Sequence, residues 1–186
     1  MRRGNQRWVT GDLEHPHQTV ARREETSHHQ DPFAVVFSCI DSRVPPEIVF
    51  DRGIGDLFVI RTGAQVLDRS IVLGSIEFGP NGYNSQLIVV LGHSECGAVI
   101  AAIGVFEGGD PPPGHIGAVV DALRPAYLVA KPEPGSLVDN MVRAQVRLTV
   151  AELKSDPLLA KLMVEKGLRI VGGHYDLFTG VVDIIA

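Results

Sequence analysis

Short apolar runs alternate with amphipathic segments along the chain. Three runs are rich in β-branched residues and apolar at consecutive positions: FAVVFS (33–38), LFVIR (57–61) and QLIVVLG (86–92). Because a strand in a parallel sheet is buried on both faces, such uninterrupted runs favour parallel strands over half-exposed ones. A last apolar segment at 168–185 contains DLFTG, a turn-like sequence that predicts a closing pair of strands.

The segments between and after these runs show helical periodicity, with apolar residues every three or four positions. We expect helices at 69–78, 94–107, 115–130, 136–154 and 157–166. Ser136 is a suitable N-cap for the longest of them. Strands that alternate with helices predict an α/β fold in which helices cover a mostly parallel central sheet.

Composition and charge narrow the class of protein. The chain has 186 residues, 45% of them hydrophobic, which suits a single domain with a substantial core. A net charge of −5 without a long basic run argues against a nucleic-acid partner. No apolar run approaches the roughly 18 residues that a membrane span needs, and no apolar core of a signal peptide follows the first arginines. We therefore expect a soluble, cytoplasmic protein without membrane contact.

The two cysteines, Cys39 and Cys96, are the first candidates for chemistry. A disulfide is unfavoured in a cytoplasmic chain; two unrelated buried thiols are the ordinary alternative, and metal ligation is the more specific one. Cys39 ends one apolar run and His93 directly follows another. Ser94 is well placed to cap a helix that begins at Glu95, which would put Cys96 in the first turn, where the helix dipole favours a thiolate.

These three side chains predict a zinc site. The carboxyl ends of parallel strands share one edge of a sheet, so Cys39, His93 and Cys96 converge there if their strands are neighbours. Two thiolates and one imidazole are ligands that Zn²⁺ prefers. Three protein ligands leave a fourth position open, so the set indicates a catalytic site with one Zn²⁺ per chain. A structural site would need a fourth Cys or His at short spacing.

Asp41 and Arg43 follow Cys39 in the sequence CIDSRV and suit such a site. A carboxylate at this place could orient a zinc-bound hydroxide or relay its proton, but it could also occupy the fourth metal position. Arg43 offers a planar fork that can hold the carboxylate off the metal. The alternative is a surface ion pair worth under about 1 kcal/mol.

CIDSRV at 39–44 together with GHSECGAV at 92–99 resembles the β-class carbonic anhydrases, and the similarity extends over roughly residues 5–182. The resemblance implies zinc-dependent, reversible hydration of CO₂ to bicarbonate and a proton by attack of zinc-bound hydroxide. It implies the ligands Cys39, His93 and Cys96 and the catalytic pair Asp41 and Arg43. It further implies four parallel strands plus an edge strand, and a homodimer or tetramer, because the family's active site lies at a dimer interface.

The resemblance also implies residues that bind substrate. Gln30 matches a position whose side chain hydrogen-bonds the substrate, Phe58 matches a pocket aromatic, and Phe78 stands where some members have tyrosine. Gly97 follows the cysteine ligand as it does in the family. We expect CO₂ to sit in a small apolar pocket near Val44, Phe58 and Phe78.

Two departures from the family pattern concern the surroundings of the site. RTGAQ at 61–65 replaces the commoner Arg-Asn-Ala-Gly-Asn sequence. Val36 stands where a regulatory bicarbonate site of some members needs tryptophan, although Arg61 and Tyr175 resemble its other partners. We therefore expect that bicarbonate site to be absent.

The domain assignment follows from these patterns, and two other functions stay open. Residues 1–30 are polar and carry Trp8, so we expect an N-terminal arm or helix that packs on a partner subunit, or else a frayed terminus. Residues 31–186 form a single zinc-binding α/β catalytic domain. The same ligands occur in relatives that hydrolyse carbon disulfide or carbonyl sulfide, and a zinc-binding protein without turnover is the other alternative.

Overall fold

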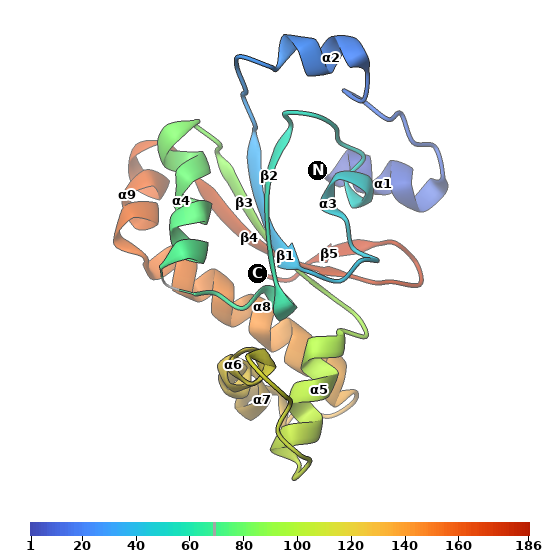
Figure 1. Ribbon diagram of the computed structural model, residues 1–186, viewed down its shortest axis with the longest axis vertical. Helices are drawn as coiled ribbons and strands as arrows, with labels where there is room; N and C mark the ends of the chain where they lie inside the picture. The colour runs from blue at the N-terminus through green and yellow to red at the C-terminus, as the bar shows by residue number, and fades with distance from the viewer. Residues whose placement is uncertain (69) are drawn as a thin grey trace.

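The computed structural model describes residues 1–68 and 70–186 and shows an α/β architecture (Figure 1). Its strands are β1 (Ala34–Cys39), β2 (Leu57–Thr62), β3 (Leu87–His93), β4 (Arg169–Tyr175) and β5 (Val182–Ile184). They form one sheet in the order β2-β1-β3-β4-β5, in which β1 to β4 are parallel and β5 is an antiparallel edge strand. The predicted fold class is confirmed, and DLFTG lies in the turn between β4 and β5, as predicted.

Most predicted helices are present with shifted ends. The helices are α1 (Arg2–Thr10), α2 (Val20–Glu25), α3 (Pro46–Val49), α4 (Ile71–Gly82), α5 (Gly97–Phe106), α6 (Ile116–Ala122), α7 (Arg124–Ala130), α8 (Leu137–Ser155) and α9 (Pro157–Glu165), with a 3₁₀ turn η1 (Gly63–Gln65). Position 69, the start of one predicted helix, lies outside the described residues. No helix within 1–68 or 70–186 is long and apolar enough to cross a membrane.

The single helix predicted at 115–130 is wrong, because the chain divides it into α6 and α7 at Leu123. Pro125 lies in the first turn of α7. Its ring clashes with a helical carbonyl four residues earlier and it has no N–H to donate, so it is tolerated only near a helix start. The break was therefore encoded in the sequence.

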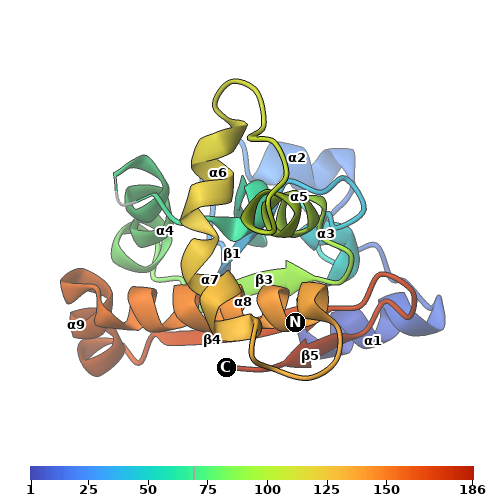
Figure 2. The same cartoon turned by 90° about the horizontal axis from the view of Figure 1, so that it is seen from below.

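Helices cover both faces of the sheet (Figure 2). Alternate residues of β1 and β3, such as Phe37 and Val90, pack with side chains of α4, α8 and α9 in one buried cluster. The intervening residues, such as Val36 and Leu91, face the opposite way and pack near Phe50, just after α3, and Trp8 of α1. This two-sided burial explains the uninterrupted apolar runs.

The N-terminal helix α1 is joined to the body of its own chain. The Asn5 side chain donates to the carbonyl oxygens of Val49 (3.2 Å) and Gly180 (2.8 Å), and its oxygen accepts from Val182 N–H. Trp8 Nε1 donates to the Tyr175 hydroxyl at 3.1 Å. These bonds hold α1 against α3 and the β4–β5 turn. The packing of residues 1–30 on a partner subunit stays a prediction.

Two glycines let α8 approach the sheet closely. A Cβ built on Gly92 of β3 or on Gly172 of β4 would lie 2.6 Å from a methyl group of Val146. Real Cβ atoms do not come this close to a neighbour, so both positions need glycine for space. Since β3 ends at His93, the packing of α8 against β3 also helps to position the His93 side chain.

We predict that Gly172→Ala lowers the free energy of unfolding by about 1–3 kcal/mol, because the added methyl group overpacks the interface with Val146. Val146→Ala should relieve this clash, so the double variant should be more stable than the sum of the single changes. Urea denaturation measures all of these values. Gly104→Ala in α5 is the matched control, since its Cβ would meet no atom within 4 Å; additive costs for Gly172→Ala and Val146→Ala would contradict the packing argument.

His174 of β4 is buried between charged groups of α8. Its side chain is 3% exposed, its Nε2 lies 2.9 Å from Asp139 Oδ1, and its Nδ1 lies 3.3 Å from Arg143 Nη2. Burial and the Arg143 guanidinium lower the pKa of His174, against the carboxylates of Asp139, Asp176 and Asp183, which raise it. The net effect is that the imidazole is harder to protonate in the folded protein than in the unfolded chain.

A histidine that is harder to protonate when folded makes stability depend on pH. The unfolded chain binds this proton more readily, so stability should be complete above about pH 6.5 and fall as the pH is lowered, by at most about 1.4 kcal/mol per pH unit. His174→Gln should reduce that slope in chemical denaturation between about pH 5 and 6.5. His115→Gln, at an exposed position, is the control; equal slopes in wild type and His174→Gln would refute the assignment.

Candidate metal centre

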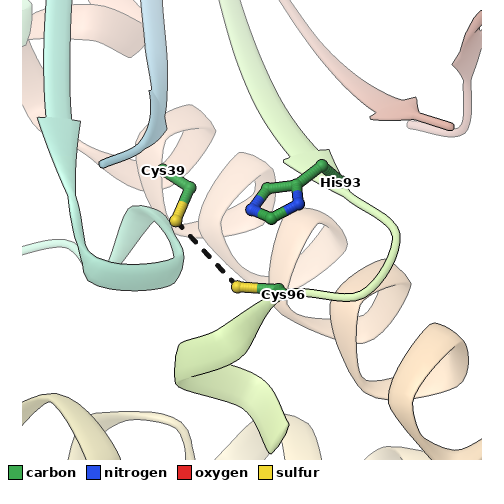
Figure 3. A group of neighbouring side chains, drawn as sticks. All are labelled: Cys39, His93 and Cys96. Carbon is green, nitrogen blue, oxygen red and sulfur yellow. Dashed lines mark hydrogen bonds between the residues drawn. The ribbon is translucent and has the colours of Figure 1, made fainter. Parts of the chain in front are cut away.

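Cys39, His93 and Cys96 meet at the carboxyl edge of the sheet (Figure 3). Cys39 is the last residue of β1, and His93 is the last residue of the neighbouring strand β3. The ligand atoms of all three residues lie within 4.8 Å of one another, and the two sulfurs are 3.9 Å apart. All three side chains are buried. The convergence predicted from the strand ends is thus present in the fold.

The segment after β3 differs from the prediction. Helix α5 begins at Gly97, and Cys96 is its N-cap residue rather than part of its first turn. Glu95 has a left-handed backbone with φ of 52°, which is incompatible with a helix starting there. Ser94 does not cap α5, because its hydroxyl accepts a hydrogen bond from Leu177 N–H at 3.0 Å. The bend at Glu95 returns the chain so that Cys96 faces Cys39.

The two thiols are hydrogen-bonded to each other at 3.9 Å. The bond from the Cys96 thiol lowers the pKa of Cys39 despite burial, and the backbone N–H groups of Asp41 and Ala64 act in the same direction. The same bond, together with burial, raises the pKa of Cys96. Deprotonation of the second thiol is unfavourable, because it would place two negative charges side by side in a buried site. A bound dication removes this obstacle, because it compensates both sulfur charges.

The histidine presents a free lone pair toward the sulfurs. His93 Nδ1 lies 2.8 Å from the carbonyl oxygen of Ser94, an acceptor, so Nδ1 carries the hydrogen. Nε2 is then unprotonated, and it is buried without a hydrogen-bond partner among residues 1–68 and 70–186. Orienting a metal-binding imidazole through its other nitrogen is a common arrangement at metal sites. The donor set of two sulfurs and one imidazole nitrogen therefore fits Zn²⁺.

Asp41 is turned toward Arg43. Arg43 Nε donates to Asp41 Oδ1 at 2.9 Å and its Nη2 donates to Oδ2 at 2.7 Å, a bidentate pair. The hydrogen bond from Arg43 lowers the pKa of Asp41 to about 2, against a smaller opposing effect of burial. Asp41 Oδ2 also lies 3.8 Å from His93 Nε2. An ionised carboxylate therefore stands beside the ligand atoms while bonded to the arginine.

The predicted substrate residues lie in several places. Phe58 and Phe78 stack edge to face at 6.4 Å and line an open hollow beside β2 and α4. Gln30 lines another hollow, with His28, His29 and Tyr83. Val44 is fully buried in the core near Val36, and Gly97 directly follows Cys96. None of the three metal-ligand candidates is among the described residues that line these two hollows.

The sequence did not show that two residues of the segment RTGAQ contact Cys39 directly. Ala64 N–H donates to Cys39 Sγ at 3.3 Å, although Ala64 needs a positive φ of 49° to do so. Arg61 donates to the carbonyl oxygens of Cys39 and Asp41. The only available signal was a charged residue at the end of an otherwise apolar strand.

Comparisons with known proteins agree with this geometry. A family model described as "Carbonic anhydrase" matches residues 34–182. A protein of Mycobacterium tuberculosis named "Carbonic anhydrase 2" is 42% identical over 97% of this chain and 87% of its own length. A "Carbonic anhydrase" of Mycolicibacterium smegmatis is 41% identical over 97% and 88%. Among solved structures, one of two tetrameric β-carbonic anhydrases from Sordaria macrospora superposes with a TM-score of 0.80 at 22% identity, over 88% of this chain and 85% of that one.

Proposed function

The chain belongs to the β-carbonic anhydrase family, and on this basis we propose that it catalyses the reversible hydration of CO₂ to bicarbonate and a proton at a zinc centre. One observation carries the proposal: the bare Nε2 of His93 and the sulfurs of Cys39 and Cys96 lie within 4.8 Å of one another, beside an Asp41–Arg43 pair. A site that only held the fold together would have no use for that pair.

The three residues would hold one zinc ion per chain through two sulfurs and one nitrogen. When bound, zinc supplies Lewis acidity that makes a water molecule deprotonate near neutral pH and act as a nucleophile. The fold contributes burial of the ligands, since these side chains are 3%, 0% and 2% exposed for Cys39, His93 and Cys96. Two thiolates would cancel the charge of the dication and weaken its effect on the acidity of a bound water. The neighbouring carboxylate of Asp41 would therefore matter more for orienting that water.

Asp41 would orient the attacking oxygen by accepting a hydrogen bond from it. This role needs an ionised carboxylate, and the bond from Arg43 keeps the pKa of Asp41 near 2. Arg43 occupies both carboxylate oxygens, and its Nη2 also donates to the carbonyl oxygen of Glu95 at 3.1 Å. The arginine thus ties the Asp41 loop to the segment that carries Cys96 and fixes the two segments relative to each other.

The substrate pocket is proposed to be completed by a second copy of the chain. Gln30, Phe58, Phe78 and Gly97 would form its walls, and Val44, which is fully buried, would support them from the core; Phe78 is 59% exposed and available to a partner. A homodimer or tetramer is supported by the Sordaria macrospora relatives, whose structures are tetrameric. A cytoplasmic location is supported by the two free thiols, which a reducing compartment preserves.

We predict that Asp41→Asn lowers kcat/KM for CO₂ hydration by at least about a hundredfold, in line with the loss of a general acid–base or orienting group. The zinc content should stay unchanged, because the ligand atoms are intact. Stopped-flow hydration with parallel metal analysis measures both quantities. Asp121→Asn is the matched control, since Asp121 also pairs with an arginine but is 76% exposed; full turnover in Asp41→Asn would remove Asp41 from the mechanism.

Carbon disulfide and carbonyl sulfide hydrolysis is the second candidate function, since the same ligand set serves both chemistries. Turnover of CO₂ and of the two sulfur compounds should be measured side by side on one zinc-loaded preparation. The proposal expects CO₂ to be preferred. Full zinc loading without turnover of any of the three would instead support a zinc-binding protein without enzymatic activity.

A further inference from the structure

Strand β2 and the turn after it hold the loop that carries Cys39 and Asp41. Arg61 Nε donates to the carbonyl oxygen of Cys39 at 2.8 Å, and its Nη2 donates to the carbonyl oxygen of Asp41. Ile40 N–H donates to the carbonyl oxygen of Thr62 at 3.0 Å. Ala64 N–H donates to Cys39 Sγ at 3.3 Å. Every residue from 39 to 41 is therefore bonded to the segment 61–64.

The hydrogen-bond partners of Arg61 are unusual for an arginine. No carboxylate of residues 1–68 and 70–186 forms an ion pair with it, and its hydrogen bonds to these residues go to two backbone carbonyl oxygens. A guanidinium fork that bonds two carbonyls fixes their relative orientation, which a single donor does not. Since one carbonyl belongs to Cys39 and the other to Asp41, the fork fixes the backbone on both sides of Ile40.

The orientation of Asp41 matters because its carboxylate is close to the ligand atoms. Asp41 Oδ2 is 3.8 Å from His93 Nε2, so a modest rotation of the loop would bring it into the fourth metal position. The Arg43 bonds oppose this movement, but the Arg43 side chain is 54% exposed. Exposed ion pairs contribute little, whereas bonds from a charged donor in a part-buried place contribute more.

We propose that Arg61 is a positioning residue whose bonds to the carbonyl oxygens of Cys39 and Asp41 keep the Asp41 carboxylate turned toward Arg43 and away from the fourth metal position. The assignment deepens the proposed function and rests on the same zinc site. It predicts that a variant without the fork closes its own metal site with Asp41.

Binding of azide to the cobalt-loaded protein tests this without turnover. Co²⁺ replaces zinc as a coloured probe, and azide changes its visible spectrum when it enters the fourth position. Arg61→Gln should raise the dissociation constant of azide by about tenfold or more, because the carboxylate competes for that position. Adding Asp41→Asn to Arg61→Gln should restore azide binding to the value of Asp41→Asn alone. A general loss of structure would not be reversed by this second change.

The controls separate positioning from folding and from activity. Arg147→Gln, at an exposed position of α8, should bind azide like wild type. Arg61→Lys keeps the charge but not the planar fork, and should weaken azide binding to a smaller extent. If circular dichroism shows that Arg61→Gln does not fold, azide binding to Arg61→Lys is measured with and without Asp41→Asn, and this comparison then tests the role of Arg61.

Wild-type azide affinity in the folded Arg61 variants, or a loss that Asp41→Asn does not restore, overturns the proposal. A different result separates the two proposals. If the variants show the expected azide affinities but zinc-loaded wild type does not hydrate CO₂, the proposed function is contradicted and the assignment of Arg61 stands.

Discussion

Two sulfurs and one imidazole nitrogen are buried together at the carboxyl edge of the sheet, and the geometry of the site depends on this. The sulfurs are 3.9 Å apart, and the hydrogen bond between them lowers the pKa of Cys39 while it raises that of Cys96. Burying a thiolate beside a second sulfur and an imidazole costs free energy unless a positive charge lies between them. A dication with a preference for sulfur and nitrogen would satisfy the arrangement, and the resulting centre would be electrically neutral.

The fold supplies this geometry through ordinary packing. β1 and β3 are neighbours and parallel, so their last residues reach the same edge. Val146 of α8 packs against Gly92 and Gly172 and sets how closely the helix approaches those strands. The end of β2 then determines how the residues after β1 lie, through Arg61 and the turn at Ala64. The positions of Cys39, Asp41 and His93 depend on these three restraints in turn.

The parts of the structure that follow from periodicity could be predicted from the sequence. Uninterrupted β-branched runs gave parallel strands, and parallel strands put Cys39 and His93 on one edge. The segment at Glu95 could not be predicted, because a left-handed glutamate has no sequence signature and looks like the start of a helix. The same holds for Ala64 and Gln65, which take positive φ beside a glycine that does not. Arg61 was named only for its resemblance to a residue of the family's bicarbonate site, and its bonds to Cys39 and Asp41 were not foreseen because the partners are backbone atoms, which a sequence pattern does not reveal.

The most direct test of the account is a zinc titration of metal-depleted protein, with CO₂ hydration measured at each step. Activity should be absent at the start, rise in proportion to added zinc, and stop rising at one equivalent per chain, since Cys39, His93 and Cys96 form one group of ligand atoms. Hydration by metal-free protein would contradict the account. So would zinc that binds at one equivalent without producing hydration at any pH between about 7 and 9, the range in which a zinc-bound water ionises.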